Sequence, residues 1–252
     1  MHAPLKAPLL RVSPASAQLA KYASNDYLAL RIVYANVISE ICHHAGADID
    51  EVLAIMGSEK RIGSHYWYPG LGYGGSCFPK DVKALAAYTK QFLPDSENLF
   101  AFINGLNNKR PLQVLNKLEQ TMGGFHGKKI AVLGLSFKPN TDDQREAPAL
   151  FIIPYLLEHG AVVTSYDPMV KAIASETIGN QSNYRQQSSI AEAAAGADAI
   201  IALIEWQEII SFDFSSVKEA KKQYLFDVRN QLIPEKIKLA GFYYLGNGRY
   251  SK

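Results

Sequence analysis

The sequence predicts an α/β protein in which a helical first half is followed by a doubly wound parallel sheet. Apolar residues recur at helical spacing from residue 13 to 121, whereas short buried strands alternate with helices from residue 128 to 252. Strands that alternate with helices favour a parallel sheet, because each crossover helix returns the chain to the same end. A ligand of such a sheet is expected beyond the carboxyl ends of the strands.

The helical half is expected to begin after residues 1–12, a Pro- and Ala-rich stretch that reads as a disordered leader. Ser13 and Pro14 supply an N-cap and a first-turn proline for a long helix over 15–45, which Gly46 ends. This helix is apolar on most of its surface. It must therefore be buried, either in a core or against a partner subunit.

Capping signals divide the rest of the first half. Asp48 and Glu51 form a capping-box pattern for a short helix that ends near Gly57. Pro111 lies inside a later helical pattern and should kink or break it, because proline removes a backbone donor. The later predicted helices span residues 79–92 and 95–121.

A glycine-rich stretch at 122–127 is the best candidate for a linker between a helical domain, 13–121, and a second domain, 128–252. The second domain contains the strand and helix patterns in alternation. Strands are predicted at 129–137, 161–166, 197–204, 224–228 and 242–245, with helices at 147–158 and 190–195.

Composition excludes several classes of protein. A net charge of +2 argues against a broad polyanion-binding surface, so no nucleic-acid partner is expected. No apolar run reaches membrane-spanning length and no signal peptide is evident, which predicts a cytoplasmic protein without a membrane partner. The two cysteines, Cys42 and Cys77, form neither a disulfide framework nor a metal-binding spacing, so no metal is expected.

The stretch Gly-Tyr-Gly-Gly-Ser-Cys-Phe-Pro-Lys-Asp at 72–81 indicates an active site. Glycines allow the backbone to approach a ligand closely, and Pro79 suits the first turn of a helix. A thiol at a helix N-terminus beside Lys80 is expected to be nucleophilic, which makes Cys77 the candidate nucleophile. Cys42, inside the apolar helix, is predicted to be a core residue.

Residues 70–75 match the dinucleotide-binding pattern of three glycines, but the match is rejected. That pattern needs a preceding strand and a following helix within a strand–helix–strand unit. Here the preceding residues are His-Tyr-Trp-Tyr-Pro, and no parallel-strand unit follows. These glycines are therefore not expected to hold a cofactor.

Polar residues at the predicted sheet edge are further candidates. Lys138 and Arg145 offer cations to a phosphate or a ribose after the first strand, and Arg229 ends the strand at 224–228. Asp143 and Glu146 are expected either to cap the following helix or to contact a ligand.

Lys21 and Asn25 are four residues apart, so they share one face of the long helix. A lysine in such a helix is usually at an exposed edge, so spacing alone leaves this pair open between an exposed edge and a prepared polar pocket.

Taken together, the motifs resemble those of the UDP-glucose/GDP-mannose dehydrogenase family, and most closely its UDP-glucose branch. The resemblance runs from Ser13 to the C-terminus. The matching motifs are residues 21–25 with Arg31, 61–63, 72–81, 137–143 with Arg145 and Glu146, 205–206 and 226–230. It implies a central helical dimerisation domain and a Rossmann-like UDP-binding domain, with a homodimer formed through the helix at 15–45.

The resemblance also implies a four-electron oxidation of UDP-glucose to UDP-glucuronate with two molecules of NAD. Cys77 would form a thiohemiacetal and then a thioester, and hydrolysis would release the product. Lys21 and Asn25 would hold the oxyanion and the hydrolytic water, and Asp81 would take part in proton transfer.

The remaining roles implied by the resemblance concern binding. Lys80 and Arg145 are assigned to NAD, and Arg61 to the UDP-sugar across a dimer interface. The other residues assigned to the UDP-sugar are Tyr66, Tyr73, Gly74, Lys138 and Arg229.

Three departures from the family pattern stand out. Val228 replaces the usual glycine before Arg229, and Pro111 is unusual in the connecting helix. Family members begin with a glycine-rich NAD-binding domain, which this sequence lacks.

We therefore expect an incomplete dehydrogenase that cannot turn over UDP-glucose alone. Three alternatives stay open: a non-catalytic nucleotide-sugar-binding or dimerising module, half of a split enzyme with a separate NAD-binding polypeptide, and the GDP-mannose branch.

Overall fold

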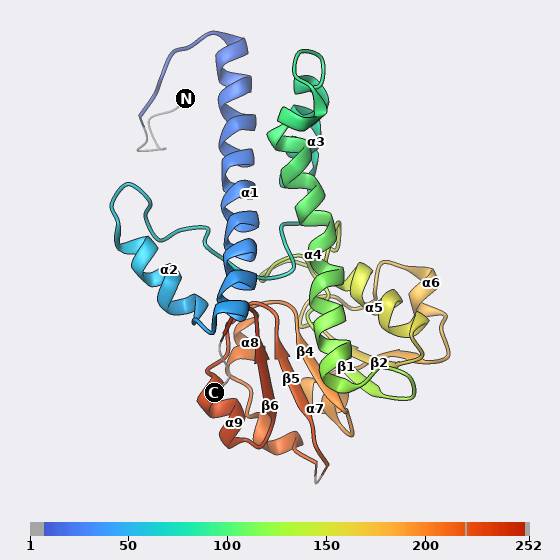
Figure 1. Ribbon diagram of the computed structural model, residues 1–252. Coiled ribbons are helices and arrows are strands. Elements are labelled where there is room, and N and C mark those ends of the chain that lie inside the picture. The colour runs from blue at the N-terminus through green and yellow to red at the C-terminus, as the bar shows by residue number, and fades with distance from the viewer. Residues whose placement is uncertain (1–7, 220, 250–252) are drawn as a thin grey trace.

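The chain forms a helical half that stands on the carboxyl-end edge of a six-stranded parallel sheet (Figure 1). The structure, a computed structural model, describes residues 8–219 and 221–249. This arrangement confirms the predicted α/β class. Most of the predicted leader, residues 1–7, lies outside the described residues, and residues 8–13 precede the first helix without regular structure.

The helical half contains α1 (Pro14–Ala45), α2 (Ile49–Ser58), α3 (Phe78–Thr89), the 3-10 turn η2 (Asp95–Glu97) and α4 (Leu99–Met122). The sheet half contains β1 (Lys129–Leu133), α5 (Ala149–Glu158), β2 (Val162–Tyr166), α6 (Glu176–Gly179), β3 (Tyr184–Gln186), α7 (Ile190–Ala194), β4 (Ala199–Ala202), α8 (Gln207–Ile210), η3 (Phe214–Val217), β5 (Tyr224–Asp227), α9 (Pro234–Leu239) and β6 (Tyr243–Gly246).

The strands lie in the order β3-β2-β1-β4-β5-β6, and every neighbouring pair is parallel. The order reverses between β1 and β4, which is where ligands of doubly wound sheets bind. The strand predicted at 129–137 ends at Leu133, because Gly134 turns the chain with φ of 100° against Ile204. The short edge strand β3 was not predicted.

The caps of α1 confirm the sequence prediction. The Ser13 side chain accepts a hydrogen bond from the N–H of Ser16 at 3.1 Å, and Gly46 ends the helix in the left-handed conformation with φ of 70°. Asp48 caps α2, although its carboxylate accepts from the N–H of Asp50. These local signals were readable because each involves neighbours within four residues.

Helix α4 connects the two halves. It begins after Asn98, which caps it, and continues through Pro111 to Met122, so of the predicted kink or break the break does not occur. The first part of α4 packs against α1 and α3, whereas its second part belongs to the core of the sheet half. Tertiary packing on both sides of Pro111 offsets the loss of one backbone hydrogen bond.

The C-terminal end of the described chain returns to the helical half. The carbonyl of Gly248 accepts from the N–H of Ile49 at 3.0 Å, and the Arg249 guanidinium donates to Asp50 at 2.7 Å. The predicted linker is also packed, since Met122 and Phe125 are buried in the larger core. The two halves are therefore joined by contacts far apart in sequence as well as by the chain.

Candidate active site

Three of the four predicted catalytic residues are joined by hydrogen bonds between α1 and α3. The Lys21 ammonium donates to Asn25 Oδ1 at 3.1 Å, and Asn25 Nδ2 donates to Asp81 Oδ2 at 2.6 Å. The Lys80 ammonium forms an ion pair with the other oxygen of Asp81. The pair Lys21 and Asn25 is therefore a prepared polar group and not merely an exposed edge.

Asp81 is buried and held in its ionised form. Burial opposes ionisation, but hydrogen bonds from Lys80 and Asn25 outweigh it and hold the pKa of Asp81 below its usual value. The same hydrogen bond to Asp81 raises the pKa of Lys80, and the charges of Asp81, Tyr22 and Cys77 act in the same direction. The network thus presents a carboxylate with fixed orientation beside the thiol.

Cys77 is exposed and is the N-cap residue of α3. Its carbonyl accepts from the N–H of Asp81 at 3.0 Å, so the thiol and the carboxylate are one helical turn apart. Cys42 is buried, as predicted, and its burial raises the pKa of that thiol. Exposure, position and neighbours all separate the two cysteines.

The glycines of the glycine segment, residues 70–76, allow close packing. A side chain at Gly72 would meet the amide of Asn107 at 2.3 Å, and one at Gly74 would meet the carbonyl of Glu146 at 2.5 Å. Asn107 in turn holds Tyr73, accepting from its N–H at 2.8 Å and donating to its carbonyl at 3.1 Å. The segment approaches protein backbone and side chains, which supports the rejection of a dinucleotide turn.

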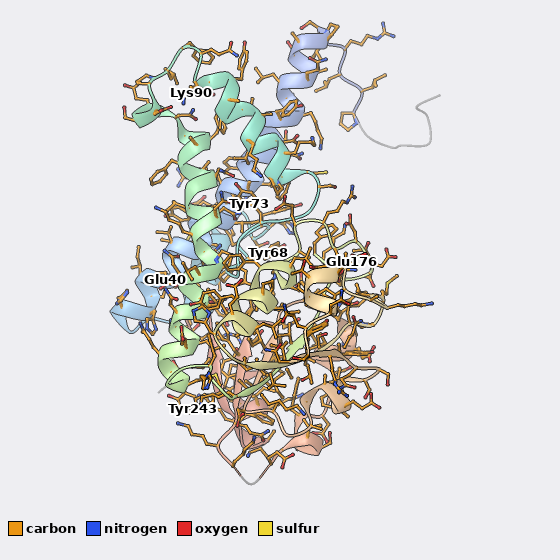
Figure 2. All side chains as sticks on the ribbon, turned by 90° about the vertical axis from the view of Figure 1, so that its right-hand side faces the viewer. Glu40, Tyr68, Tyr73, Lys90, Glu176 and Tyr243 are labelled. Carbon is orange, nitrogen blue, oxygen red and sulfur yellow. The ribbon has the colours of Figure 1, made fainter. Side chains whose placement is uncertain are left out.

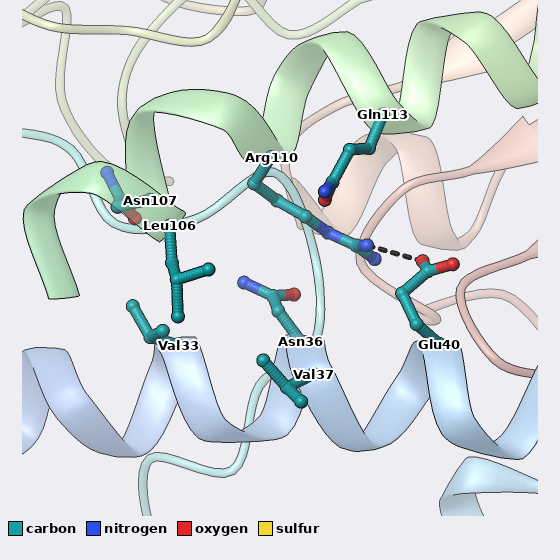
Figure 3. Close-up of a pocket in the computed structure, with 8 residues that line it drawn as sticks. All are labelled: Val33, Asn36, Val37, Glu40, Leu106, Asn107, Arg110 and Gln113. Atoms are coloured by element: carbon teal, nitrogen blue, oxygen red, sulfur yellow. Dashed lines mark hydrogen bonds and ion pairs between the residues drawn. The ribbon is translucent and has the colours of Figure 1, made fainter. Parts of the chain in front are cut away.

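Arg110 is a central residue that the sequence analysis missed. It is buried beside a cavity of about 230 Å³ between α1 and α4, where Figure 3 shows it reaching toward Glu40. Its Nε donates to the carbonyl of Gly70 at 2.8 Å, and Nη2 donates to Ser39 at 3.1 Å and to Asn247 at 3.2 Å. One side chain thus ties the glycine segment to α1 and to the end of β6.

The charge of Arg110 is matched by Glu40. Burial acts to raise the pKa of Glu40, but the hydrogen bond and charge of Arg110 outweigh it, so the pKa lies below its usual value. Asn36 completes the anchor, because its Oδ1 accepts from the N–H of Gly70 at 2.7 Å. No local pattern in the sequence could have indicated these contacts.

Aromatic side chains line the approach to Cys77. The rings of Tyr66 and Tyr73 each lie 6.2 Å from the ring of Phe78, the residue after the thiol. Tyr66 has φ of 65°, an unusual conformation for a tyrosine. Figure 2 labels Tyr73 and Tyr68 near the junction of the two halves.

The sheet edge contributes the predicted cations Arg229 and Arg145. Arg229 Nε lies 3.6 Å from Glu205 Oε2, and a side chain at Gly70 would meet Arg229 at 3.3 Å. Val228 is buried and has no positive φ, so no glycine is required before Arg229. Arg229 therefore meets the glycine segment at the boundary of the two halves.

Arg145 pairs with Asp143 at 2.6 Å. Hydrogen bonds from Arg145 lower the pKa of Asp143 to about 2. The prediction that Asp143 and Glu146 cap α5 was wrong, because Pro148 occupies the N-cap position without a side-chain bond. The hydrogen bond to Asp143 is the first cause that raises the pKa of Arg145 above its usual value.

Lys138 follows β1 at the same edge, with its ammonium 5.3 Å from the ring centre of Phe137. A side chain at Gly75 would meet that ring at 2.8 Å, so the loop of Lys138 also touches the glycine segment.

Arg61 stands apart from this cluster. Its side chain is 86% exposed and pairs with Glu59 at 3.1 Å. The loop that carries it is held by Arg31, which donates to the carbonyls of Ile62 and Gly63 at 2.9 and 3.0 Å. The structure thus presents Arg61 outward from a fixed loop.

Asp167, at the end of β2, was also missed. Its Oδ2 accepts from the N–H groups of Leu135 and Ser136 and from the indole of Trp206, while Oδ1 accepts from the N–H groups of Met169 and Val170. An acidic residue at this place holds a ribose in dinucleotide-binding sheets. Here its oxygens are already used to fix the turn after β1.

Two family models match the chain: the central domain of the UDP-glucose/GDP-mannose dehydrogenase family over residues 15–108, and the UDP-binding domain of the same family over residues 131–234. Among curated relatives, UDP-glucose 6-dehydrogenase YwqF of Bacillus subtilis is 40% identical over 247 residues, covering 98% of this chain and 56% of the relative. A UDP-glucose 6-dehydrogenase of Pseudomonas aeruginosa is 38% identical, covering 92% and 52%.

Among solved structures, a UDP-glucose dehydrogenase from Pyrobaculum islandicum superposes with a TM-score of 0.83 at 31% identity, covering 99% of this chain and 55% of that one. A GDP-mannose dehydrogenase from Pseudomonas aeruginosa gives a TM-score of 0.54 at 25% identity, covering 92% and 53%. The chain spans about half the length of the relatives it matches. Motifs, fold and both domain matches agree, and the chain belongs to the UDP-glucose/GDP-mannose dehydrogenase family.

Proposed function

We propose that this chain carries the thiol and UDP-sugar sites of a UDP-glucose 6-dehydrogenase. The observation that supports this most strongly is the hydrogen-bonded series Lys21, Asn25 and Asp81 one helical turn from the exposed Cys77. Acyl-transfer chemistry on a thiol needs this combination of nucleophile, oriented carboxylate and amide or ammonium donors. The similarity to enzymes named UDP-glucose 6-dehydrogenase supports the choice of substrate.

In the proposed reaction the C6 alcohol of the sugar first gives up a hydride and a proton to become an aldehyde, and the Cys77 thiolate adds to that aldehyde and forms a thiohemiacetal. NAD, when bound, supplies the chemistry of hydride acceptance. After hydride loss the sulfur carries a thioester, which water hydrolyses to the carboxylate and the free thiolate. The Lys21 ammonium and the Asn25 amide stabilise negative charge on the sugar oxygen and orient the water, and Asp81 accepts a proton from that water.

The nucleotide is proposed to lie at the carboxyl edge of the sheet, between the two halves. Lys138 and Arg229 follow β1 and β5 and supply cations for the pyrophosphate. The sugar lies against Tyr66, Tyr73 and Gly74, which lead to Cys77.

A homodimer through α1 is proposed from its exposed apolar face. Tyr27, Tyr34 and Ile41 are seven residues apart, so they lie on one face of α1, and all three are exposed in the single chain. Arg61, presented outward by the Arg31 loop, would then enter the UDP-sugar site of the second copy. A dimer by analytical ultracentrifugation, dissociated by Tyr34→Glu, is the expected result.

Lys80 and Arg145 are proposed to form only part of an NAD site. As cations they suit a phosphate or a ribose, but in the described residues neither glycine turn nor Asp167 forms a dinucleotide site. We therefore propose that the described residues alone do not reduce NAD with UDP-glucose. A second candidate function, a nucleotide-sugar-binding module, is supported by the match to the UDP-binding domain over residues 131–234. No described helix is long and apolar enough to cross a membrane, and a cytoplasmic location stays a prediction.

Calorimetry and cysteine modification test these proposals. UDP-glucose should bind with measurable heat, should bind more tightly than GDP-mannose, and should slow alkylation of Cys77 by iodoacetamide. Arg229→Met should weaken binding at least tenfold, whereas Lys83→Met, an exposed control on α3, should not change it. Binding without protection of Cys77 would favour the binding module, and NADH production by the chain alone would refute the proposed lack of NAD reduction.

A further inference from the structure

Asp26 is a buried carboxyl group that the proposed mechanism does not use. It lies on α1 directly after Asn25, is 1% exposed, and neither of its oxygens has a hydrogen-bond partner among the described residues. The hydroxyl of Tyr73, in the glycine segment, is likewise buried without a partner. An ionised carboxylate in such surroundings is costly, so its retention calls for a physical reason.

The surroundings of Asp26 leave its charge uncompensated. Lys21 and Arg31, five residues away on either side along α1, donate to Asn25 and to backbone carbonyls. From α3 the facing charge is Asp81, and from the glycine segment the facing group is the Tyr73 hydroxyl.

Across the α1–α4 contact, Arg110 pairs with Glu40 near the far end of α1, and Lys80 on α3 pairs with Asp81. None of these cations forms an ion pair with Asp26 among the described residues, and Arg31 Nε is itself buried without a hydrogen-bond partner.

Asp26 directly follows Asn25, whose side chain donates to Asp81 at 2.6 Å, so two buried carboxyl groups meet at the same contact between α1 and α3 and act on each other. Burial first, and the charge of Asp81 second, raise the pKa of Asp26 to about 6. The charge of Asp26 also adds to burial in raising the pKa of Tyr73. Coupling between two titrating groups is reciprocal, so an ionised Asp26 must strengthen proton binding at Asp81.

We propose that Asp26 is a positioning residue for Asp81: once ionised, its buried carboxylate makes Asp81 a stronger base toward the water that hydrolyses the thioester. In that step one proton moves from water to Asp81, the water oxygen bonds to the thioester carbon, and the carbon–sulfur bond breaks to release the Cys77 thiolate. In this hydrolysis step Asp26 exchanges no proton with water or substrate and acts only through its charge. The inference rests on the proposed role of Asp81.

The test is a pH titration of the chain labelled with ¹³Cγ-aspartate, followed by NMR, with the signals assigned through Asp26→Asn and Asp81→Asn. We expect one aspartate with a midpoint near pH 6, against 3.8 for an ordinary aspartate, and a second step in the Asp81 signal at that same pH. Asp26→Asn should remove both steps and move the main titration of Asp81 to lower pH. Tyr73→Phe, which alters the same cluster but keeps both carboxyls, should retain both steps.

An Asp81 signal without a step at the midpoint of Asp26 would overturn the inference, as would the absence of any aspartate titrating above pH 5. If Asp26→Asn does not fold, the titration of the unmodified chain decides: a second step in the Asp81 signal at the midpoint of the aspartate that titrates near pH 6 supports the coupling, and an Asp81 titration in a single step refutes it. The titration needs neither UDP-glucose nor NAD. The coupling between Asp26 and Asp81 can therefore be measured even if the proposed function fails its own test.

Discussion

Replacing Asp26 by asparagine should change the pH dependence of stability in a defined direction. The pKa of Asp26 is raised from 3.8 to about 6 in the folded chain, so the folded state holds this proton more tightly than the unfolded state. The resulting loss of folding free energy is absent well below pH 3.8, grows between pH 3.8 and 6, and levels off at higher pH. Asparagine has nearly the same shape but no charge, so its own cost does not vary with pH.

The magnitude follows from the two pKa values. At about 1.36 kcal/mol for each tenfold change in proton affinity, the penalty is about 1 kcal/mol at pH 4.5 and about 3 kcal/mol at pH 8. The stability of Asp26→Asn relative to the unmodified chain should therefore rise by about 2 kcal/mol between these pH values.

Urea unfolding at pH 4.5, 6 and 8 measures this difference directly. Asp142→Asn, at an exposed aspartate, is the matched control and should show the same difference from the unmodified chain at each pH. A free-energy gap for Asp26→Asn that stays constant across the range would refute the argument that Asp26 is buried without compensation.

Three further predictions concern packing and reactivity. Arg110→Met should destabilise the chain by about 2–4 kcal/mol in urea unfolding, because it removes a buried guanidinium that donates to Gly70, Ser39 and Asn247; a loss below 1 kcal/mol would contradict this. Gly74→Ala should destabilise by about 1–3 kcal/mol, since its side chain would lie 2.5 Å from a carbonyl, whereas Gly105→Ala, with open space around it inside α4, should stabilise by about 0.5–1 kcal/mol. Iodoacetamide should modify exposed Cys77 in the folded chain, whereas buried Cys42 should react only after unfolding. Equal labelling of the two cysteines in peptide mass spectra would contradict the burial of Cys42 and the exposure of Cys77.

The predictable part of the site consisted of residues whose role is visible in local sequence. Cys77 at the start of α3 and the spacing of Lys21 and Asn25 are properties of one helix each. The parallel sheet followed from the alternation of strands and helices, whereas the order of its strands came from the structure. Strand β3 was missed because three residues on an edge carry little pattern. Asp143 and Glu146 do not cap α5 because the helix begins at Ala149, with Pro148 at the N-cap position.

By itself the sequence determined the α/β class, the ends of α1 and the family, because each is encoded by neighbours in the chain or by ordered motifs, and it predicted Cys77 as the nucleophile. Only the tertiary structure decided the partners of Arg110, which come from residues 40 to 137 positions away, and the burial of Asp26. It also decided that α4 runs through Pro111. The physical reason is that burial and long-range pairing depend on which surfaces meet. A charge that looks solvated in sequence becomes costly, or essential, only after those surfaces exclude water.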